Sequence, residues 1–158
     1  MALVGLWKCV KYLAGIGIAG FFLGRILPKA WFQWDCFPYK TYPFEKNGQL
    51  YQRLRIQKWQ NRVPDMSRIL PGLMPAKKLP AKPSKEHLSV MLQETCIAEL
   101  IHGLLLFGGL FCGRIWPGIG GNIVVFLNTL GNIPFILIQR YNRPRFLRLY
   151  QRHIREVA

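Results

Sequence analysis

Glu99 and His102 place two ionisable groups inside an almost entirely apolar stretch of the chain, residues 97–115. Residues three apart on a helix share a face, so the carboxylate and the imidazole would be neighbours. A positioned histidine is the commonest general base, and ionisable groups inside a membrane helix usually have a partner and a function. We therefore predict His102 as a catalytic base and Glu99 as its partner. The alternative is that these two side chains only satisfy each other.

A metal site is the other chemistry that this spacing suggests. Glu-x-x-His pairs also occur in carboxylate-bridged di-iron helical bundles, which need two such pairs and further carboxylates. The chain has seven acidic residues and no second Glu-x-x-His. The sequence therefore predicts no metal and no bound cofactor.

Amide side chains lie within and at the end of the next apolar segment, residues 118–138. If the two segments form an antiparallel hairpin centred on Pro117, residues equally distant from it in sequence lie level with each other. His102 is then level with Asn132, and Thr95 with Gln139. We predict that Asn132 and Gln139 contact a substrate. The alternative is that they join membrane helices by hydrogen bonds.

The segment that follows is basic. Guanidinium groups bind phosphate with paired hydrogen bonds, so this segment predicts contacts to a phosphorylated substrate. The residues concerned are Arg140, Arg143 and Arg145, with Asn142 supporting them. The alternative is that the arginines contact anionic lipid headgroups.

Composition indicates an all-α membrane protein. The chain combines 51% hydrophobic residues with a formal net charge of +15 over 158 residues, which is unusual for one soluble domain. Three segments are long and apolar enough to cross a hydrocarbon layer of about 30 Å. We expect a single membrane domain over 1–158, with helices at 3–27, 97–115 and 118–138, an amphipathic interfacial helix within 50–63 and a basic C-terminal helix within 139–158.

The distribution of positive charge predicts the orientation. Residues 28–92 contain twelve Lys or Arg and the tail contains six, whereas the turn between the second and third spans has only Arg114. Because positive residues stay on the cytoplasmic side, residues 28–92, with a Pro-rich strap at 64–83, and the C-terminus are expected in the cytoplasm. The amino terminus would then lie outside, unless the first segment dips into the membrane and returns. Orientation explains the charge, so no nucleic-acid partner is expected.

Two further expectations concern the N-terminal segment and the cysteines. The apolar run that ends near residue 27 contains Arg25 close to its end and is followed by Pro28 and Lys29. It has no small-x-small cleavage site, so a retained anchor is expected rather than a cleaved signal.

The four cysteines stand singly, with no CxxC pair. We expect them to be unpaired rather than joined in disulfides.

Several motifs resemble one known family. They are Glu94-Thr-Cys-Ile-Ala-Glu-Leu-Ile-His102, Asn132-Ile-Pro-Phe-Ile-Leu-Ile-Gln-Arg-Tyr-Asn-Arg-Pro-Arg145, Phe44-Glu45-Lys46-x-Gly48 and the Lys58-Trp59 region. Together they resemble the glycosyl-4,4'-diaponeurosporenoate acyltransferases, small bacterial membrane enzymes of carotenoid glycoside biosynthesis. The resemblance implies a fatty acyl thioester donor, a glycosyl carotenoid or similar glycolipid acceptor, and a place in the bacterial cell (inner) membrane. It also adds Glu94, Lys58 and Trp59 to the residues expected to bind substrate.

The sequence thus predicts an acyltransferase that esterifies a sugar hydroxyl of a glycolipid with a fatty acyl group. The donor would be acyl-CoA or an acyl carrier thioester, used as a co-substrate among the membrane lipids. The alternative is a non-catalytic subunit that packs against a larger membrane complex.

Overall fold

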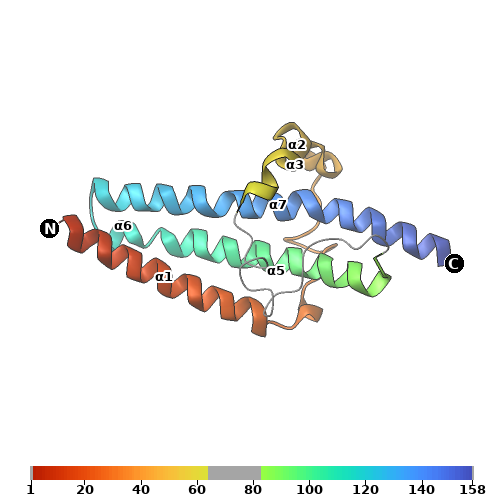
Figure 1. Cartoon of the computed structure of the whole chain (residues 1–158), viewed down its shortest axis with the longest axis horizontal. Helices are drawn as coiled ribbons and strands as arrows, with labels where there is room; N and C mark the ends of the chain where they lie inside the picture. Colours follow the sequence, from red (N-terminus) through yellow and green to blue (C-terminus); the bar gives the residue numbers. More distant parts are fainter. Residues whose placement is uncertain (1, 64–82, 158) are drawn as a thin grey trace. The chain divides into compact units, whose positions relative to one another are not determined.

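The computed structural model describes residues 2–63 and 83–157, and every regular element in these two ranges is helical. The elements are α1 (Ala2–Ile26), η1 (Lys29–Trp31), η2 (Pro43–Gly48), α2 (Gln49–Arg53), α3 (Ile56–Trp59), η3 (Gln60–Arg62), α5 (Lys85–Gly109), α6 (Cys112–Ile115) and α7 (Ile119–Val157) (Figure 1). The expected all-α fold is confirmed. The Pro-rich strap predicted at 64–83 lies outside the described residues except for Pro83.

Within residues 2–63 and 83–157, three helices are long and apolar enough to cross a membrane, as predicted. They occupy Ala2–Ile26, Lys85–Ile115 with a short interruption, and Ile119–Arg155. The first agrees with the predicted span within one residue at each end. The second begins at Lys85, ahead of the apolar run at 97–115, and Ser84 caps it: its Oγ accepts a hydrogen bond from the His87 N–H at 3.2 Å.

The third apolar segment and the basic tail form one continuous helix, α7, rather than two. Pro134 and Pro144 both lie inside it without ending it. Proline removes one backbone donor, but membrane helices tolerate this where neighbouring groups satisfy the freed carbonyl. The predicted basic C-terminal helix is therefore the last part of α7.

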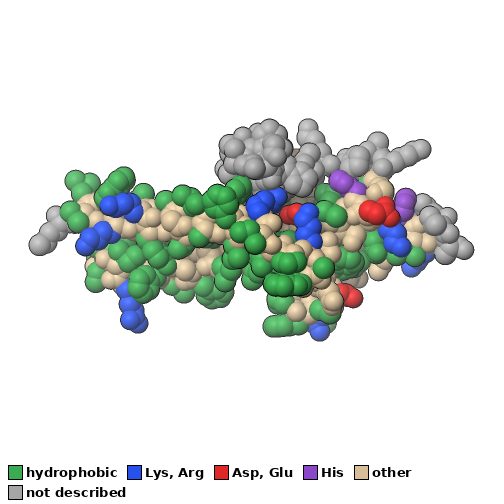
Figure 2. Space-filling view, turned by 90° about the horizontal axis from the view of Figure 1, so that it is seen from below, with side chains coloured by type: hydrophobic (Ala, Val, Ile, Leu, Met, Phe, Trp, Pro, Cys, Tyr) green, Lys and Arg blue, Asp and Glu red, His purple; other side chains and the backbone are tan. Residues whose placement is uncertain are grey.

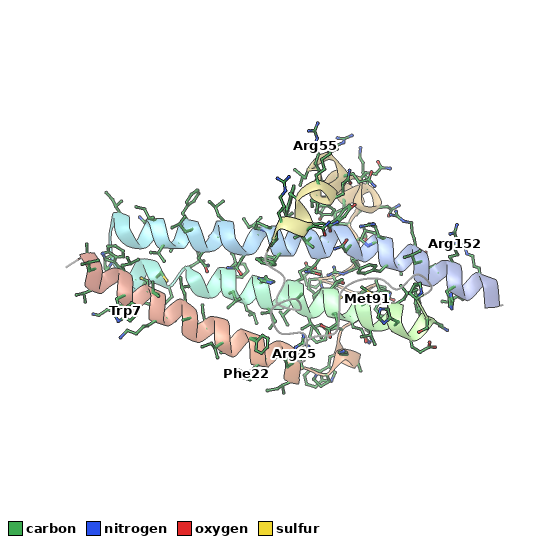
Figure 3. All side chains as sticks on the ribbon, in the orientation of Figure 1. Trp7, Phe22, Arg25, Arg55, Met91 and Arg152 are labelled. Carbon is green, nitrogen blue, oxygen red and sulfur yellow. The ribbon has the colours of Figure 1, made fainter. Side chains whose placement is uncertain are left out.

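The segment predicted as one amphipathic helix over 50–63 is divided into α2, α3 and η3. The division occurs at Arg55, which has a left-handed backbone with φ of 52°. Trp59 closes the bend, since its indole N–H donates to the Leu54 carbonyl at 3.1 Å. Arg55 and Lys58 are exposed, and Arg55 points away from α7 (Figure 3).

The chain forms two compact units, and α5 and α7 contribute to both. Unit 1 consists of Met1–Trp31 and Ile97–Ile136, and unit 2 consists of Phe32–Cys96 and Leu137–Ala158. Each unit contains some of the residues predicted from the sequence to form the functional site.

In unit 1, α1 is an uninterrupted helix that packs along α6 and the C-terminal part of α5. Cys9 Sγ lies 3.8 Å from the Cys112 carbonyl, and the Tyr12 hydroxyl donates to the Gly108 carbonyl at 3.0 Å. Further along α1, the absence of side chains at Gly20 and Gly24 lets Ile101 approach closely. A segment that dips and returns would need a turn, and α1 has none.

The outer surface of unit 1 is largely apolar. Large hydrophobic side chains on all three of its long helices are exposed, which suits contact with lipid rather than water (Figure 2). They include Ile18, Phe22, Phe107, Phe126, Leu127 and Leu130.

Unit 2 has a separate small core. Tyr51, Ile56 and Tyr141 are buried together, and Leu50, Trp59, Leu137 and Ile138 pack against them. This core fixes the short helices α2 and α3 against α7. The four cysteines of the chain are all free, as predicted.

Candidate functional site

His102 lies on α5 within unit 1, half-buried, and contacts two residues of α7. Its Nδ1 is 3.0 Å from Asn132 Oδ1, so the expected pairing of these residues across the hairpin is confirmed. Its ring stacks on Phe135, with the centroids 4.3 Å apart and an interplanar angle of 4°. The imidazole is therefore held at one edge and on one face.

The amide of Asn132 is itself held by the preceding turn of α7. Its Nδ2 donates to the Asn128 main-chain carbonyl at 2.9 Å and to Asn128 Oδ1 at 3.2 Å. Asn128 Nδ2 in turn donates to the Leu105 carbonyl of α5 at 3.2 Å. Asn128 reaches this carbonyl because Gly109 leaves space: a Cβ there would be only 1.9 Å from Asn128 Nδ2.

Glu99 lies half-buried one turn before His102 on α5. A carboxylate at this place adds negative potential on the side of the helix that carries the imidazole. Glu99, His102 and Asn132 thus make up the part of the predicted site that belongs to unit 1.

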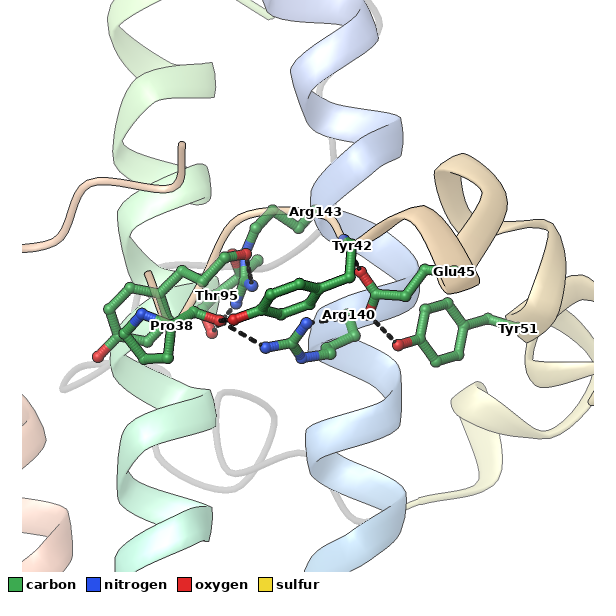
Figure 4. A network of polar contacts seen from close by, with 8 residues as sticks. Pro38, Tyr42, Glu45, Tyr51, Thr95, Arg140 and Arg143 are labelled. Atoms are coloured by element: carbon green, nitrogen blue, oxygen red, sulfur yellow. Dashed lines mark hydrogen bonds and ion pairs between the residues drawn. The ribbon is translucent and has the colours of Figure 1, made fainter. Parts of the chain in front are cut away.

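The basic segment of α7 belongs to unit 2, where Arg140 forms an ion pair with Glu45. Arg140 Nη1 lies 2.9 Å from Glu45 Oε1, and Nη2 donates to the Pro38 carbonyl at 2.7 Å (Figure 4). The guanidinium also lies 5.3 Å from the ring centre of Tyr42. Arg140 therefore links α7 to the irregular segment before α2.

Glu45 is almost fully buried and accepts hydrogen bonds on both oxygens. The Tyr42 main-chain N–H donates to Oε2 at 2.7 Å, and the Tyr51 hydroxyl donates to Oε1. Burial raises the pKa of this carboxyl, but the hydrogen bonds from Tyr51, Tyr42 and Arg140 and the charge of Arg140 outweigh it, so the pKa is lowered. Glu45 is thus an ionised anchor beneath a basic surface.

Gly48 explains part of the Phe44-Glu45-Lys46-x-Gly48 motif. It has φ of +92°, a conformation that glycine adopts without strain, and a Cβ there would lie 3.1 Å from Pro144 of α7. In the sequence, Glu45 and Gly48 stand out only as motif residues, and their roles were not predicted. The available signal was a single carboxylate within a run of basic residues.

Arg143 is buried and holds Thr95 of α5. Its Nε donates to Thr95 Oγ1 at 3.0 Å and its Nη2 to the Thr95 carbonyl at 3.2 Å. Its Nη1 donates to the Tyr39 carbonyl at 2.6 Å. Thr95, expected level with Gln139, is thus bonded by a residue one turn further along α7, and Gln139 is buried at 8% exposure.

The remaining predicted residues lie nearer the surface of unit 2. Arg145 is exposed, donates to Asn142 Oδ1 at 3.3 Å and covers the Tyr141 ring at 5.0 Å. Asn142 Nδ2 donates to Gln60 Oε1 at 3.4 Å. Lys58 is exposed, while Trp59 and Glu94 are half-buried. Within residues 2–63 and 83–157, no three His, Cys, Asp or Glu side chains are grouped so as to hold a metal ion.

Comparison with known proteins gives one consistent family. The model of the family described as glycosyl-4,4'-diaponeurosporenoate acyltransferase matches residues 28–152. Proteins named glycosyl-4,4'-diaponeurosporenoate acyltransferase from Staphylococcus aureus strains bovine RF122 / ET3-1 and USA300 are similar to the chain, at 29% and 28% identity over 128 residues. Each alignment covers 80% of this chain and 76% of the relative. No solved structure matches the chain.

Proposed function

The chain belongs to the glycosyl-4,4'-diaponeurosporenoate acyltransferase family, and from this membership we propose that it transfers a fatty acyl group from a thioester donor to a sugar hydroxyl of a glycosylated carotenoid. That the chain is an acyltransferase follows from the family. The thioester donor and the identity of the acceptor are the proposed parts. The observation that supports a catalytic centre is the half-buried His102 held by Asn132 and Phe135.

In the proposed reaction, His102 removes the proton from the acceptor hydroxyl. The resulting oxygen attacks the thioester carbonyl, and the C–S bond of the tetrahedral intermediate breaks. The departing sulfur takes up the proton from the imidazolium, so that an ester and a free thiol are formed. Glu99, one turn away, favours the transient imidazolium by its charge.

The exposed cations of unit 2 are suited to the phosphates of a CoA donor. Arg145 and Lys58 are exposed, and guanidinium groups bind phosphate through charge-assisted hydrogen bonds. Arg140 and Arg143 already bond Glu45 and Thr95, so we assign them to holding this segment in place. Contacts of Gln139, Asn142, Glu94 and Trp59 with substrate stay predictions.

The proposed setting is a bacterial cell membrane, with residues 28–92 and the C-terminus in the cytoplasm. The support is the concentration of Lys and Arg in these two segments. This orientation would expose the basic segments to a soluble thioester donor. Association with a larger membrane complex also stays a prediction, and stoichiometric co-purification with other membrane proteins is its test.

Replacement of His102 tests the proposed base. In membranes supplied with acyl-CoA and a glycosylated carotenoid, His102→Ala should reduce acyl transfer by about 10²- to 10⁴-fold at equal protein level. His153→Ala removes a histidine of the same chain in unit 2 and should leave transfer near the wild-type rate. Near wild-type transfer by His102→Ala would contradict the assignment of the base.

A further inference from the structure

A directional chain of hydrogen bonds ends on the His102 imidazole. The Leu105 carbonyl accepts from Asn128 Nδ2, Asn128 Oδ1 accepts from Asn132 Nδ2, and Asn132 Oδ1 faces His102 Nδ1 at 3.0 Å. A main-chain carbonyl can only accept, so the first link fixes the orientation of the Asn128 amide. The second link then fixes the orientation of the Asn132 amide.

The orientation of Asn132 decides which nitrogen of His102 carries the proton. An amide oxygen only accepts, so Nδ1 must be the donor, and a neutral imidazole has one N–H. We infer that Asn128 and Asn132 are positioning residues that hold His102 as the Nδ1–H tautomer, leaving Nε2 as the atom that takes the proton from the acceptor. This inference rests on the proposed function. It gives Asn132 a role in orienting the base rather than in contacting substrate.

Reversal of the Asn132 amide would be unfavourable in this environment. Its NH₂ group would face His102 Nδ1, and its oxygen would face two oxygens of Asn128 that now accept hydrogen bonds from it. All three side chains are half-buried, and a buried polar group without a complementary partner costs free energy. The surrounding helices therefore favour a single orientation of the two asparagine amides and of the hydrogen bonds that lead to His102.

Imidazole ¹⁵N NMR of the full chain in detergent, labelled at histidine nitrogens, measures the tautomer directly. The chain has three histidines, and comparison with His102→Gln assigns the signals of His102. In its neutral form the wild-type imidazole should show a protonated Nδ1 and an unprotonated Nε2. Asn132→Leu should shift His102 toward the Nε2–H form that imidazole favours in water, whereas Asn122→Leu, an exposed asparagine on the same helix, should not. A wild-type Nε2–H tautomer, or no change in Asn132→Leu, would overturn the inference.

The rate of acyl transfer by variants of the two asparagines provides a second measurement. Asn132→Leu should lower kcat by about 10²-fold, and Asn128→Leu by about tenfold, since the Asn128 main-chain carbonyl still holds the Asn132 amide in that variant. Asn132→Asp keeps an oxygen acceptor facing Nδ1, so this variant should retain more activity than Asn132→Leu. Transfer by Asn132→Leu at the wild-type rate, or no rescue by Asn132→Asp, would contradict the inference.

The outcomes separate this inference from the proposed function. Loss of transfer in His102→Ala together with a wild-type Nε2–H tautomer would leave the function standing and overturn the inference. Full transfer by His102→Ala would overturn the assignment of His102 as the base and with it the catalytic meaning of the tautomer, whichever tautomer NMR finds. Absence of transfer by the wild type would overturn the proposed function itself. Circular dichroism of each variant checks that the helices have formed.

Discussion

Arg140 and Glu45 are 95 residues apart in sequence, yet their side chains meet at 2.9 Å. Glu45 is only 2% exposed, and its two oxygens also accept from Tyr42 and Tyr51. An ion pair with one partner this deeply buried is costly to break, because the remaining charge loses its compensation. This pair is one of the polar links between α7 and the segment that precedes α2, beside the bonds from Arg140 and Arg143 to main-chain carbonyls.

We expect Glu45→Gln to lower the free energy of unfolding by about 3 kcal/mol. The variant keeps the shape of the side chain but leaves Arg140 without its counter-charge. Thermal or chemical unfolding in detergent, followed by tryptophan fluorescence, measures the change. Glu86→Gln removes an exposed carboxylate and should have little effect. Equal stability of the two variants would show that the ion pair contributes nothing.

The same carboxylate predicts a dependence of stability on pH. The pKa of Glu45 is lowered in the folded chain: burial raises it, but the hydrogen bonds from Tyr51, Tyr42 and Arg140 and the charge of Arg140 prevail. A lowered folded pKa means that the stabilisation is present above the unfolded pKa of about 4.3 and is lost as the pH falls through the folded pKa. The difference in stability between wild type and Glu45→Gln should therefore shrink on acidification below about pH 4. A difference that stays constant down to pH 3 would contradict this.

Gly109→Ala should disturb Asn128 and lower acyl transfer. The new Cβ would lie 1.9 Å from Asn128 Nδ2, so the amide must move away from the Leu105 carbonyl. We expect about a tenfold loss of activity and a stability cost of about 1–3 kcal/mol. Gly103→Ala is the matched control on the same helix, because a Cβ there meets nothing within 4 Å. The two variants should differ clearly in the rate of transfer.

Arg143 is expected to support the structure of unit 2 through the shape of its guanidinium. Its side chain is 2% exposed and donates to Thr95 Oγ1, to the Thr95 carbonyl and to the Tyr39 carbonyl. Lysine keeps the charge but not the planar donor geometry. Arg143→Lys should therefore lower the unfolding free energy by about 2 kcal/mol, whereas Arg148→Lys, at an exposed position, should not. If Arg143→Lys changed only the KM for the acyl donor and left stability intact, a direct donor contact would be favoured.

The pairing of His102 with Asn132 was predictable because one tight turn fixes the register nearby. The two residues are equally distant from Pro117, and their hydrogen bond has that register. Further from the turn, Thr95 was expected level with Gln139, and the residue that bonds it is Arg143, whose long side chain reaches it from one turn beyond Gln139. Counting residues from the turn predicts which backbone positions of the two helices lie level with each other. It does not predict how far a long side chain extends along the neighbouring helix.

The role of Glu45 was not predictable from periodicity. It lies in an irregular turn whose Lys46 and Asn47 have positive φ, and its main partner comes from a helix far along the chain. The break at Arg55 was missed for a related reason: residues 50–63 have a helix-like pattern, and tertiary contacts with Tyr141 and Leu137 divide them. The local sequence pattern therefore predicted the long apolar helices but not the contacts between distant segments that build unit 2.

The stacking of Phe135 on His102 has an electrostatic consequence. An aromatic face carries partial negative charge and attracts a cation within about 6 Å of its centre, and the imidazole centroid lies 4.3 Å away. The neutral imidazole is stabilised little by the negative face of Phe135, whereas the positively charged imidazolium is stabilised more. Once His102 has accepted a proton, a side chain without any formal charge would help to stabilise it.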